Sequence, residues 1–409
     1  MNYIDLFAGA GGLSEGFMKA GFTPLAHVEM NSDACQTMKT RLGYHYLKGK
    51  RREYLYFQYL RKEISRDELY AHIPSNILET VINQEISEKT INGIFKTIDN
   101  LCLNKTVDII IGGPPCQAYS MAGRAKQKKL QEEQKIDDRN YLYKFYCRFL
   151  KKYQPKMFVF ENVPGLLTAN QGKYFKNLQA YLKKVGYQIE WRTLNASDFG
   201  VLQNRKRIII VGWKIGSQYN FPDLKPIKHT YLVNDLLSDL PSMQAGEENS
   251  EYAGEASKYL KRFSLRTKND VLTYHIARPH IERDKEIYRK TIQAWQNGHQ
   301  RLKYSSLPPE LRTHKNISSF LDRFKIVEGD MPASHTMMAH ISKDGHYFIH
   351  PDIEQARSIT VREAARIQSF PDSYYFEGGR TAAFTQIGNA VPPLMAKAIA
   401  DKLKEQLEK

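Results

Sequence analysis

The sequence predicts an α/β fold built on a doubly wound parallel sheet, and two observations support this prediction. Stretches with helical periodicity, such as "NYLYKFYCRFLKKY", lie between several of the predicted strands. Five short apolar runs have the length and composition of strands buried on both faces of a sheet: "YIDLF", "LAHVE", "VDIIIG", "MFVFE" and "RIIIVGW". With 409 residues, the chain is long enough for one large core and a second, smaller domain.

Two departures from this alternation define the expected domain organisation. Residues 44–104 are longer and more polar than one crossover between parallel strands needs, so we expect an insertion there. After Trp213 the alternation stops, and it returns only at "TVREAARIQSF". We therefore expect a first domain over 1–213, a second, smaller domain over 214–355 and a return to the first domain over 356–409.

The charge of the chain favours a polyanionic partner such as nucleic acid. Sixty Lys and Arg against 44 Asp and Glu give a net charge of +16. Residues 256–325 contain 16 of the basic and 6 of the acidic side chains, so this segment alone contributes +10. A basic surface without a special role is the alternative that charge alone leaves open.

Membrane insertion, export and a structural metal are all disfavoured by the sequence. No run of about 18 apolar residues is present, and the amino terminus "MNYIDLFAGAGG" lacks the sections of a signal peptide, so we expect a cytoplasmic protein. The cysteines form no C-x-x-C pair and show no zinc-type Cys/His spacing, which argues against disulfides and structural zinc. There are four of them: Cys35, Cys102, Cys116 and Cys147.

The first expected strand leads into a glycine-rich loop, "FAGAGGLSEGF", which is typical of a nucleoside cofactor site. Gly9, Gly11 and Gly12 precede an expected helix, where glycines let backbone N–H groups approach a ligand. Glu29 ends the next strand, 20 residues after Gly9, and is placed to accept hydrogen bonds from ribose hydroxyls. Ser14 replaces the third glycine of G-x-G-x-x-G, so the loop leaves NAD, adenosylmethionine and a tight turn without ligand as open alternatives.

A thiol and a carboxyl group follow two other expected strands. Cys116 stands after two prolines at the carboxyl end of "VDIIIG", the edge at which open parallel sheets bind ligands, and this placement indicates a nucleophile. The other cysteines are interpreted as inert buried thiols. Glu161 ends "MFVFE", where exclusion of water would raise its pKa and suit it to proton donation. Arg205 and Arg207, in "QNRKR", could hold a base carbonyl or a phosphate, with a solvated surface role as the alternative.

Taken together, the motifs resemble those of the DNA cytosine-5 methyltransferases, in the order of that family. The matching motifs are "DLFAGAGGLSEGF", "GGPPCQAYS", "ENVPGLL", "QNRKRIIIVG", "TVREAARIQSFPD" and "QIGNAVPPLMAKAIA". The resemblance is strong over about 1–213 and 356–400. It implies a Rossmann-like class I adenosylmethionine-dependent methyltransferase fold, S-adenosyl-L-methionine as cofactor, and duplex DNA as substrate. It also implies that residues 214–355 form a DNA target-recognition domain.

Carried over position by position, the resemblance assigns roles to individual residues. Cys116 would be the nucleophile, Glu161 would contact ring nitrogen 3 and the exocyclic amine of cytosine, and Arg207 would hold the base carbonyl, with Gln203 and Arg205 in support. The positions that would contact the cofactor are Phe7, Gly9, Gly11, Glu29, Met30, Pro114, Leu142 and Asn389. Where the family usually has Asp in G-D-I, this chain has "QEIS", so Glu85 is the counterpart expected at the cofactor's adenine.

The implied reaction begins when Cys116 adds to carbon 6 of a cytosine extruded from the duplex, and the methyl group then goes to carbon 5. One alternative is a tRNA cytosine-5 methyltransferase, and the basic second domain favours duplex DNA over it. Another is an inactive DNA-binding relative, which would be expected to lack Cys116, Glu161 or the glycine loop. Amino-group methylation is disfavoured because no D-P-P-Y or N-P-P-Y sequence occurs.

The chain also resembles the modification half of a bacterial restriction system. This implies a monomer that is paired in function with a restriction endonuclease but forms no stable complex with it. The segment "PASHTMMAHISKDGHYFIHP", with a turn at Asp344-Gly345, is predicted to form a hairpin that reads DNA bases. A strand pair that only builds the core of the small domain is the alternative.

Overall fold

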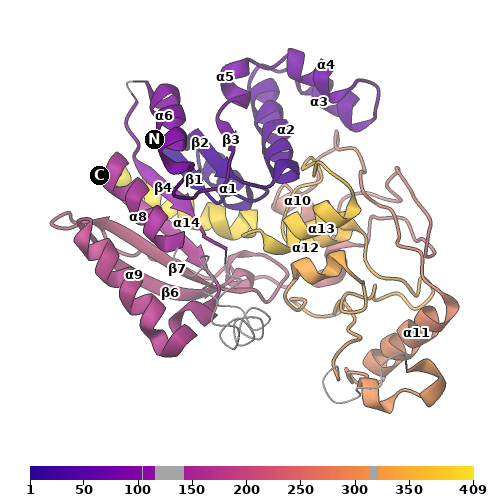
Figure 1. Ribbon diagram of the computed structural model, residues 1–409. Helices are drawn as coiled ribbons and strands as arrows, with labels where there is room; N and C mark the ends of the chain where they lie inside the picture. The colour runs from indigo at the N-terminus through magenta and orange to yellow at the C-terminus, as the bar shows by residue number, and fades with distance from the viewer. Residues whose placement is uncertain (104, 116–141, 313–320) are drawn as a thin grey trace.

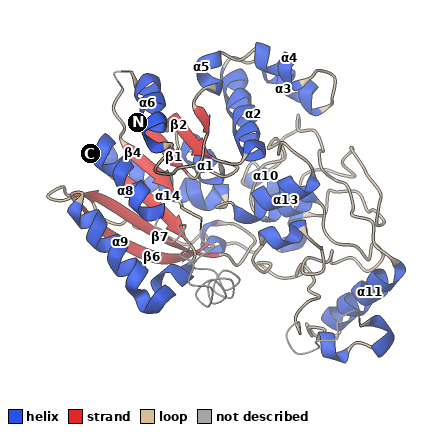
Figure 2. Ribbon diagram, viewed as in Figure 1, coloured by secondary structure: helices blue, strands red, loops and turns tan. Residues whose placement is uncertain are grey.

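The computed structural model spans residues 1–409, and it describes 1–103, 105–115, 142–312 and 321–409. Seven strands within these ranges form one sheet in the order β3-β2-β1-β4-β5-β7-β6 (Figures 1 and 2). They are β1 (Asn2–Leu6), β2 (Thr23–Glu29), β3 (Val81–Asn83), β4 (Ile109–Gly112), β5 (Met157–Asn162), β6 (Tyr187–Asn195) and β7 (Lys206–Lys214). The predicted α/β fold with a doubly wound sheet is therefore confirmed.

The sheet departs from the predicted parallel arrangement at β7. β1, β2, β3, β4 and β5 pair in parallel, whereas β7 runs antiparallel to both β5 and β6. β6 and β7 follow each other in the chain and lie side by side, and antiparallel neighbours can be joined by a short connection without a crossover helix. β6 was not expected as a strand, because "YQIEWRTLN" contains no continuous apolar run. In the structure this strand is largely exposed.

Helices cover both faces of the sheet. The described ranges contain the helices α1 (Gly12–Lys19), α2 (Ser32–Gly49), α3 (Glu53–Leu60), α4 (Arg66–Ala71), α5 (Ser75–Leu78), α6 (Ile91–Cys102), α8 (Leu142–Tyr153), α9 (Lys173–Lys184), α10 (Lys258–Arg262), α11 (Glu282–Gln296), α12 (Val361–Ile367), α13 (Arg380–Asn389) and α14 (Pro393–Leu407). α1 and α14 pack on one face, and α6, α8 and α9 pack on the other. Short 3-10 helices lie between these elements: η3 (Pro164–Leu167), η4 (Ala169–Gly172), η5 (Ala196–Phe199), η6 (Val233–Leu236), η7 (Tyr304–Ser306), η8 (Pro309–Leu311) and η9 (Ala339–Ser342).

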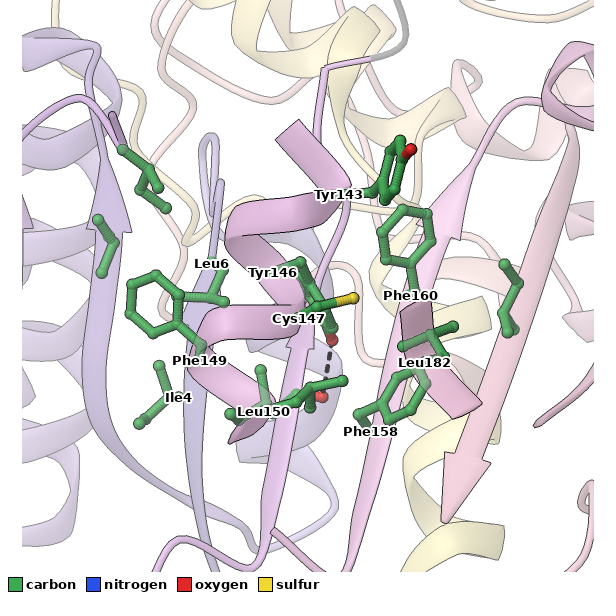
Figure 3. Packing of buried hydrophobic residues seen from close by; sticks show 14 of the residues in the cluster. Ile4, Leu6, Tyr143, Tyr146, Cys147, Phe149, Leu150, Phe158, Phe160 and Leu182 are labelled. Carbon is green, nitrogen blue, oxygen red and sulfur yellow. Dashed lines mark hydrogen bonds between the residues drawn. The ribbon is translucent and has the colours of Figure 1, made fainter. Parts of the chain in front are cut away.

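The helix α8 shows how the sequence pattern produces this packing. Its apolar side chains recur every three or four residues, so Tyr146, Phe149 and Leu150 face the sheet together (Figure 3). The buried Tyr146 hydroxyl donates hydrogen bonds to the backbone oxygens of Ile110 and Val159, at 3.2 and 3.0 Å. These bonds tie α8 to β4 and β5, and they thereby position the first turn of α8 near the carboxyl ends of those strands.

The expected insertion over 44–104 contains both ordinary and additional structure. β3 pairs with β2, and α6 covers one face of the sheet, as in a normal crossover. The additional part consists of α3, α4 and α5, which lie outside α2 at the upper edge of the molecule in Figure 1. These helices share a small hydrophobic cluster with the end of α2, to which Tyr44, Tyr56, Leu60 and Leu69 contribute.

Residues 214–355 contain little regular structure and pack in two hydrophobic clusters. The first joins η6 and α10 to α12 and α13 and therefore continues into the carboxyl-terminal part of the chain. The second surrounds α11, which lies at the end of the molecule remote from the sheet (Figure 1). The domain boundaries at 213 and 355 stay predictions.

The predicted hairpin in "PASHTMMAHISKDGHYFIHP" is wrong. This segment forms the 3-10 helix η9 and pairs with other parts of the chain through isolated bridges, Ser334 with Gln203 and Ile349 with Ile326 and Ser358. The backbone of Met338 and Ala339 packs directly on α13, where only the missing side chain of Gly388 leaves room. Contacts with α13 and isolated bridges to Gln203, Ile326 and Ser358 thus replace the pairing of this segment with itself.

Within the ranges that the structure describes, no helix combines the length and the apolar character needed to cross a membrane.

Candidate active site

The carboxyl ends of β1, β2, β4 and β5 open into one cavity of about 1570 Å³. β1 lies between β2 and β4, so the chain winds outward in one direction from β1 to β3 and in the other from β4 onward. Such a reversal leaves a crevice above the strand ends, which is where open α/β sheets bind ligands. The site thus lies at the edge of the sheet that the sequence predicted.

The glycine loop forms one wall of this cavity. Phe7 and Gly9 line it, and both have a left-handed backbone with φ of 56° and 54°. A Cβ atom at Gly9 would meet nothing within 4 Å, so this position leaves open space for a ligand. Gly11, which was predicted to contact the cofactor, does not line the cavity and instead packs against Met38 and Tyr374. Its predicted contact stays untested.

Glu29 is held at the mouth of the cavity by two backbone donors. Its Oε2 accepts a hydrogen bond from the Gly9 amide at 2.8 Å, and its Oε1 accepts one from the Asn31 amide at 2.8 Å. A carboxylate oxygen has room for more than one donor, so both oxygens can still accept hydrogen bonds from a pair of vicinal hydroxyls. This geometry suits the ribose of a nucleoside cofactor.

The other residues predicted to contact the cofactor also lie around the cavity. Met30 follows Glu29 with a side chain that is 61% exposed, and Glu85 lies just beyond β3. Leu142 starts α8, while Pro114 and Asn389 come from the loop after β4 and the end of α13. These five residues come from five segments that are far apart in the sequence.

Glu161 and Arg207 form an ion pair inside the same cavity. The Nε of Arg207 lies 2.8 Å from Oε1 of Glu161, and the two side chains are only 13% and 14% exposed. Burial raises the pKa of Glu161 above its usual range, although the charges of Arg207 and Arg205 act in the opposite direction. Gly113 makes room for this carboxyl group, because a Cβ there would lie 2.6 Å from its Oε2.

Cys116 lies outside the residues that the structure describes, but the segment leading to it is well defined. Pro114 and Pro115 line the cavity. The side-chain amide of Asn162 donates a hydrogen bond to the Pro114 oxygen at 3.0 Å, and its oxygen accepts one from the Val163 amide at 2.9 Å. Asn162 thereby connects the proline loop to the end of β5, beside Glu161. The sequence analysis assigned no role to Asn162.

Gln203 and Arg205 are fully buried and do not line the cavity. Arg205 donates hydrogen bonds to the backbone oxygens of Met337 and Gly388, at 2.6 and 2.9 Å. Gln203 donates to the Ile367 oxygen and accepts from the Met337 amide at 2.8 Å. Both residues thus join the start of β7 to η9, α12 and α13, and their supporting roles in catalysis stay predictions.

Asp5 is a cavity residue that sequence reasoning assigned no function. It is 1% exposed, and its Oδ2 has no hydrogen-bond partner among the described residues. Burial, together with the charge of Glu29, raises the pKa of Asp5 well above its usual range. The sequence offered one signal for this residue, since Asp5 is the single carboxylate within the apolar run "YIDLF". A buried strand carries a carboxyl group only at a cost in free energy.

The fold and this cavity define a class I methyltransferase that uses adenosylmethionine. The family described as C-5 cytosine-specific DNA methylase matches residues 1–54 and 70–405, so the chain belongs to that family. It is therefore a DNA cytosine-5 methyltransferase, and the predicted cofactor, S-adenosyl-L-methionine, is confirmed. The cavity suits this cofactor, because Glu29 faces it, Gly9 leaves space and Asp5 offers an unpaired buried oxygen.

Individual relatives agree with this assignment. The type II methyltransferase M.Bpa9945I of Bacillus paralicheniformis is 43% identical, over 99% of this chain and 99% of its own. The type II methyltransferases M1.HphI of Haemophilus parahaemolyticus and M.DdeI of Desulfomicrobium norvegicum are each 32% identical. They cover 98% and 100% of this chain and 86% and 89% of their own.

Solved structures share the fold. A candidate DNA modification methyltransferase encoded within an E. coli prophage superposes with a TM-score of 0.65 and 23% identity, over the full length of both chains. The methyltransferase EhMeth of Entamoeba histolytica gives a TM-score of 0.56 and 16% identity, over 100% of this chain and 99% of its own.

Proposed function

We propose that the chain methylates carbon 5 of an extruded cytosine within a specific site of duplex DNA, through a covalent bond between Cys116 and carbon 6. The observation that carries this proposal is the buried Glu161–Arg207 pair. It shares one cavity with Glu29, at the cofactor end, and with Pro115, the residue before Cys116. A carboxyl group and a guanidinium side by side suit the polar edge of cytosine, which presents nitrogen 3, an amine and a carbonyl.

The chemistry follows from the weakness of carbon 5 as a nucleophile. Addition of the Cys116 thiolate to carbon 6 makes carbon 5 electron-rich, because the ring then carries an enamine. Burial favours the protonated form of Glu161, which can donate to nitrogen 3 as negative charge develops there, while Arg207 donates to the carbonyl. When bound, S-adenosylmethionine supplies an electrophilic methyl group. A water molecule then takes the carbon 5 proton, the Cys116 thiolate leaves carbon 6, and nitrogen 3 returns its proton to Glu161, which restores the aromatic ring.

A duplex that carries 5-fluorocytosine at the target base tests this mechanism. Fluorine at carbon 5 cannot leave as a proton, so the protein should become trapped in an adduct that resists denaturation and requires S-adenosylmethionine. Cys116→Ala should form no adduct, whereas the triple variant Cys35→Ala, Cys102→Ala, Cys147→Ala should still form it. An adduct in Cys116→Ala would overturn the proposal. Methylation of tRNA in preference to duplex DNA would favour the tRNA alternative.

We infer that residues 214–355 select the DNA site. The cofactor cavity and the Glu161–Arg207 pair account for the base that reacts but not for its neighbours, and 214–355 contains the whole of the basic segment 256–325. A chimera that carries the corresponding region of a relative with another specificity should methylate the relative's site and keep its affinity for S-adenosylmethionine. If a folded, active chimera kept the original site, recognition would lie elsewhere in the chain.

We further infer that the chain acts as a monomeric modification enzyme in the cytoplasm. The relatives named above carry type II methyltransferase names, and this supports a role in protecting DNA against an endonuclease that cuts the same site. Bisulfite sequencing of DNA from cells that express the chain should show one methylated sequence context. DNA methylated in this way should resist a type II endonuclease of that specificity, and cutting at methylated sites would contradict the inference.

A further inference from the structure

The additional helices α3 and α4 contact the turn that precedes α13, and this turn reaches the cofactor cavity. The family match omits residues 55–69, which include most of α3. No residue of α3 or α4 lines the cavity. We propose that Glu377 is a positioning residue for S-adenosylmethionine binding, through which α3 and α4 hold the turn at Gly378–Arg380 against the cofactor.

The carboxylate of Glu377 is held by groups from three helices, and this residue is only 6% exposed. Its Oε1 accepts hydrogen bonds from the Tyr59 hydroxyl of α3 at 2.8 Å and from the Thr40 hydroxyl of α2 at 2.6 Å. The guanidinium of Arg66, in α4, lies 3.7 Å from its Oε2. Burial and the neighbouring carboxylate raise the pKa of Tyr59, so its hydroxyl remains a donor. A buried carboxylate needs such partners, and its position is therefore fixed by them.

The backbone of Glu377 is hydrogen-bonded to a residue of the cavity wall. Its amide donates to the Thr37 hydroxyl at 2.8 Å, and its carbonyl oxygen accepts from the side-chain amide of Gln386 at 2.9 Å. The Thr37 hydroxyl donates in turn to the side-chain oxygen of Gln386 at 2.7 Å. Gln386 lines the cofactor cavity, so the three residues form a closed ring of hydrogen bonds at its edge.

The turn at Gly378–Arg380 has little freedom to move by itself. Gly378 has a φ of 91°, and a Cβ there would lie 2.8 Å from Cγ of Asp33. Asp33, Gly379 and Arg380 all line the cavity, and Arg380 begins α13. A shift of Glu377 would therefore move either this turn or Asp33, and both belong to the wall around the cofactor.

The ring of Tyr59 also packs edge-on against Tyr375, with 5.4 Å between ring centroids. Loss of the ring would thus disturb packing, whereas loss of the hydroxyl alone would remove only the bond to Glu377. Tyr59→Phe therefore separates positioning from packing. Tyr54 offers a matched control, because it also lies in α3 but is 55% exposed and forms none of the described contacts with Glu377.

The experiment compares Tyr59→Phe, Glu377→Ala and Tyr54→Phe in the full-length protein. Calorimetry should show that Tyr59→Phe weakens S-adenosylmethionine binding by roughly three- to tenfold, because a hydrogen bond to a buried charge is lost. Glu377→Ala should weaken binding further, and Tyr54→Phe should leave it unchanged. The KM for S-adenosylmethionine should rise in parallel, while kcat at saturating cofactor and the KM for DNA stay at the wild-type value.

The conservative variant Glu377→Gln keeps an acceptor oxygen for Tyr59 and Thr40, so its affinity should lie between those of the wild type and Glu377→Ala. Unchanged cofactor affinity in Tyr59→Phe would overturn the proposal, and so would a loss of thermal stability without a change in affinity. Tyr59→Phe keeps this test decisive if Glu377→Ala fails to fold. The readout is cofactor binding, so it does not depend on the role proposed for Cys116.

Discussion

Two regions of the molecule hold their functional surfaces in different ways. In the sheet region, residues 1–213 and 380–409, backbone ladders fix the site, since Leu6 pairs with Gly112 and Gly112 with Phe160 at the strand ends below the cavity. In the irregular region, residues 214–379, the described residues pair only through isolated bridges. There the chain is joined by buried ion pairs instead, such as Arg357–Glu363 at 2.7 Å and Arg366–Asp372 at 2.6 Å.

This difference has a physical consequence. A backbone ladder does not depend on the identity of the side chains, so strand pairing in the sheet region should tolerate substitution of single polar groups outside its own buried ion pairs, Glu15–Arg41 and Glu161–Arg207. A buried ion pair consists of two specific side chains, and removal of one leaves the other charged and unsolvated. The irregular region should therefore be the more sensitive of the two, both to substitution of a charged residue and to pH.

The largest effect is expected for Arg366→Ala. Arg366 contacts the carboxylates of Asp239 and Asp372 at 2.5 and 2.6 Å, and all three side chains are fully buried. The substitution should lower the free energy of unfolding by about 3 to 5 kcal/mol, because two buried carboxylates each lose a charged partner. Denaturant unfolding followed by circular dichroism measures this loss. The exposed pair Lys402–Glu405 is the control, and Lys402→Ala should leave the free energy of unfolding almost unchanged, because water screens this pair.

Gly113→Ala should have the next largest effect. It tests whether a substitution in the sheet region lowers activity only where the new side chain contacts an active-site residue, here Glu161. The new Cβ would lie 2.5 Å from the Glu161 carbonyl oxygen and 2.6 Å from its Oε2. Displacement of this carboxyl group by a fraction of an ångström should reduce single-turnover methylation by about 10- to 100-fold. Gly93→Ala in α6 meets no atom within 4 Å and should keep full activity.

Acid should weaken the irregular region through its buried histidines. Burial lowers the pKa of His280, His335 and His350 to about 4, below the ordinary value of 6.5. Their neutral forms therefore stabilise the fold above pH 6.5, and this contribution is lost as the pH falls toward 4, because the unfolded chain then binds more protons. At pH 5, each of these histidines should lower the free energy of unfolding by about 1 to 2 kcal/mol.

Amide hydrogen exchange at pH 7 and pH 5, corrected for intrinsic rates, locates this loss. The irregular region should lose protection first. In the sheet region, burial likewise lowers the pKa of His27 to about 4, and it also lowers the pKa of His45. Equal loss of protection in both regions would remove the distinction between them.

The smallest effect is expected at the rim of the cofactor cavity, where Arg148 and Glu88 form an ion pair at 2.7 Å. Both side chains are more than a third exposed, so water screens their attraction. Glu88→Gln should change the affinity for S-adenosylmethionine by less than about twofold in calorimetry. A larger change would show that an exposed pair can matter as much as the hydrogen bonds of Glu29.

The sequence predicts much of the sheet region because its signals are local. Continuous apolar runs identify β1, β2, β4, β5 and β7, since such runs must be buried on both faces. β6 escapes the same criterion because one of its sides stays in water, and the antiparallel direction of β7 depends on which strand it meets. The predicted hairpin at 344–345 fails for a related reason, because tertiary partners at Gln203 and Gly388 determine the conformation of that segment.

The sequence by itself determined the fold class, the family and the cofactor, and it placed Gly9, Glu29 and Glu161 at the strand ends where they line the cavity. Only the tertiary structure decided which polar side chains are buried and what each one contacts. Glu377 shows the reason: its partners Tyr59 and Thr40 lie 318 and 337 positions away in the chain. Apolar periodicity is written into neighbouring residues, whereas the partner of a buried charge is known only after the chain has folded.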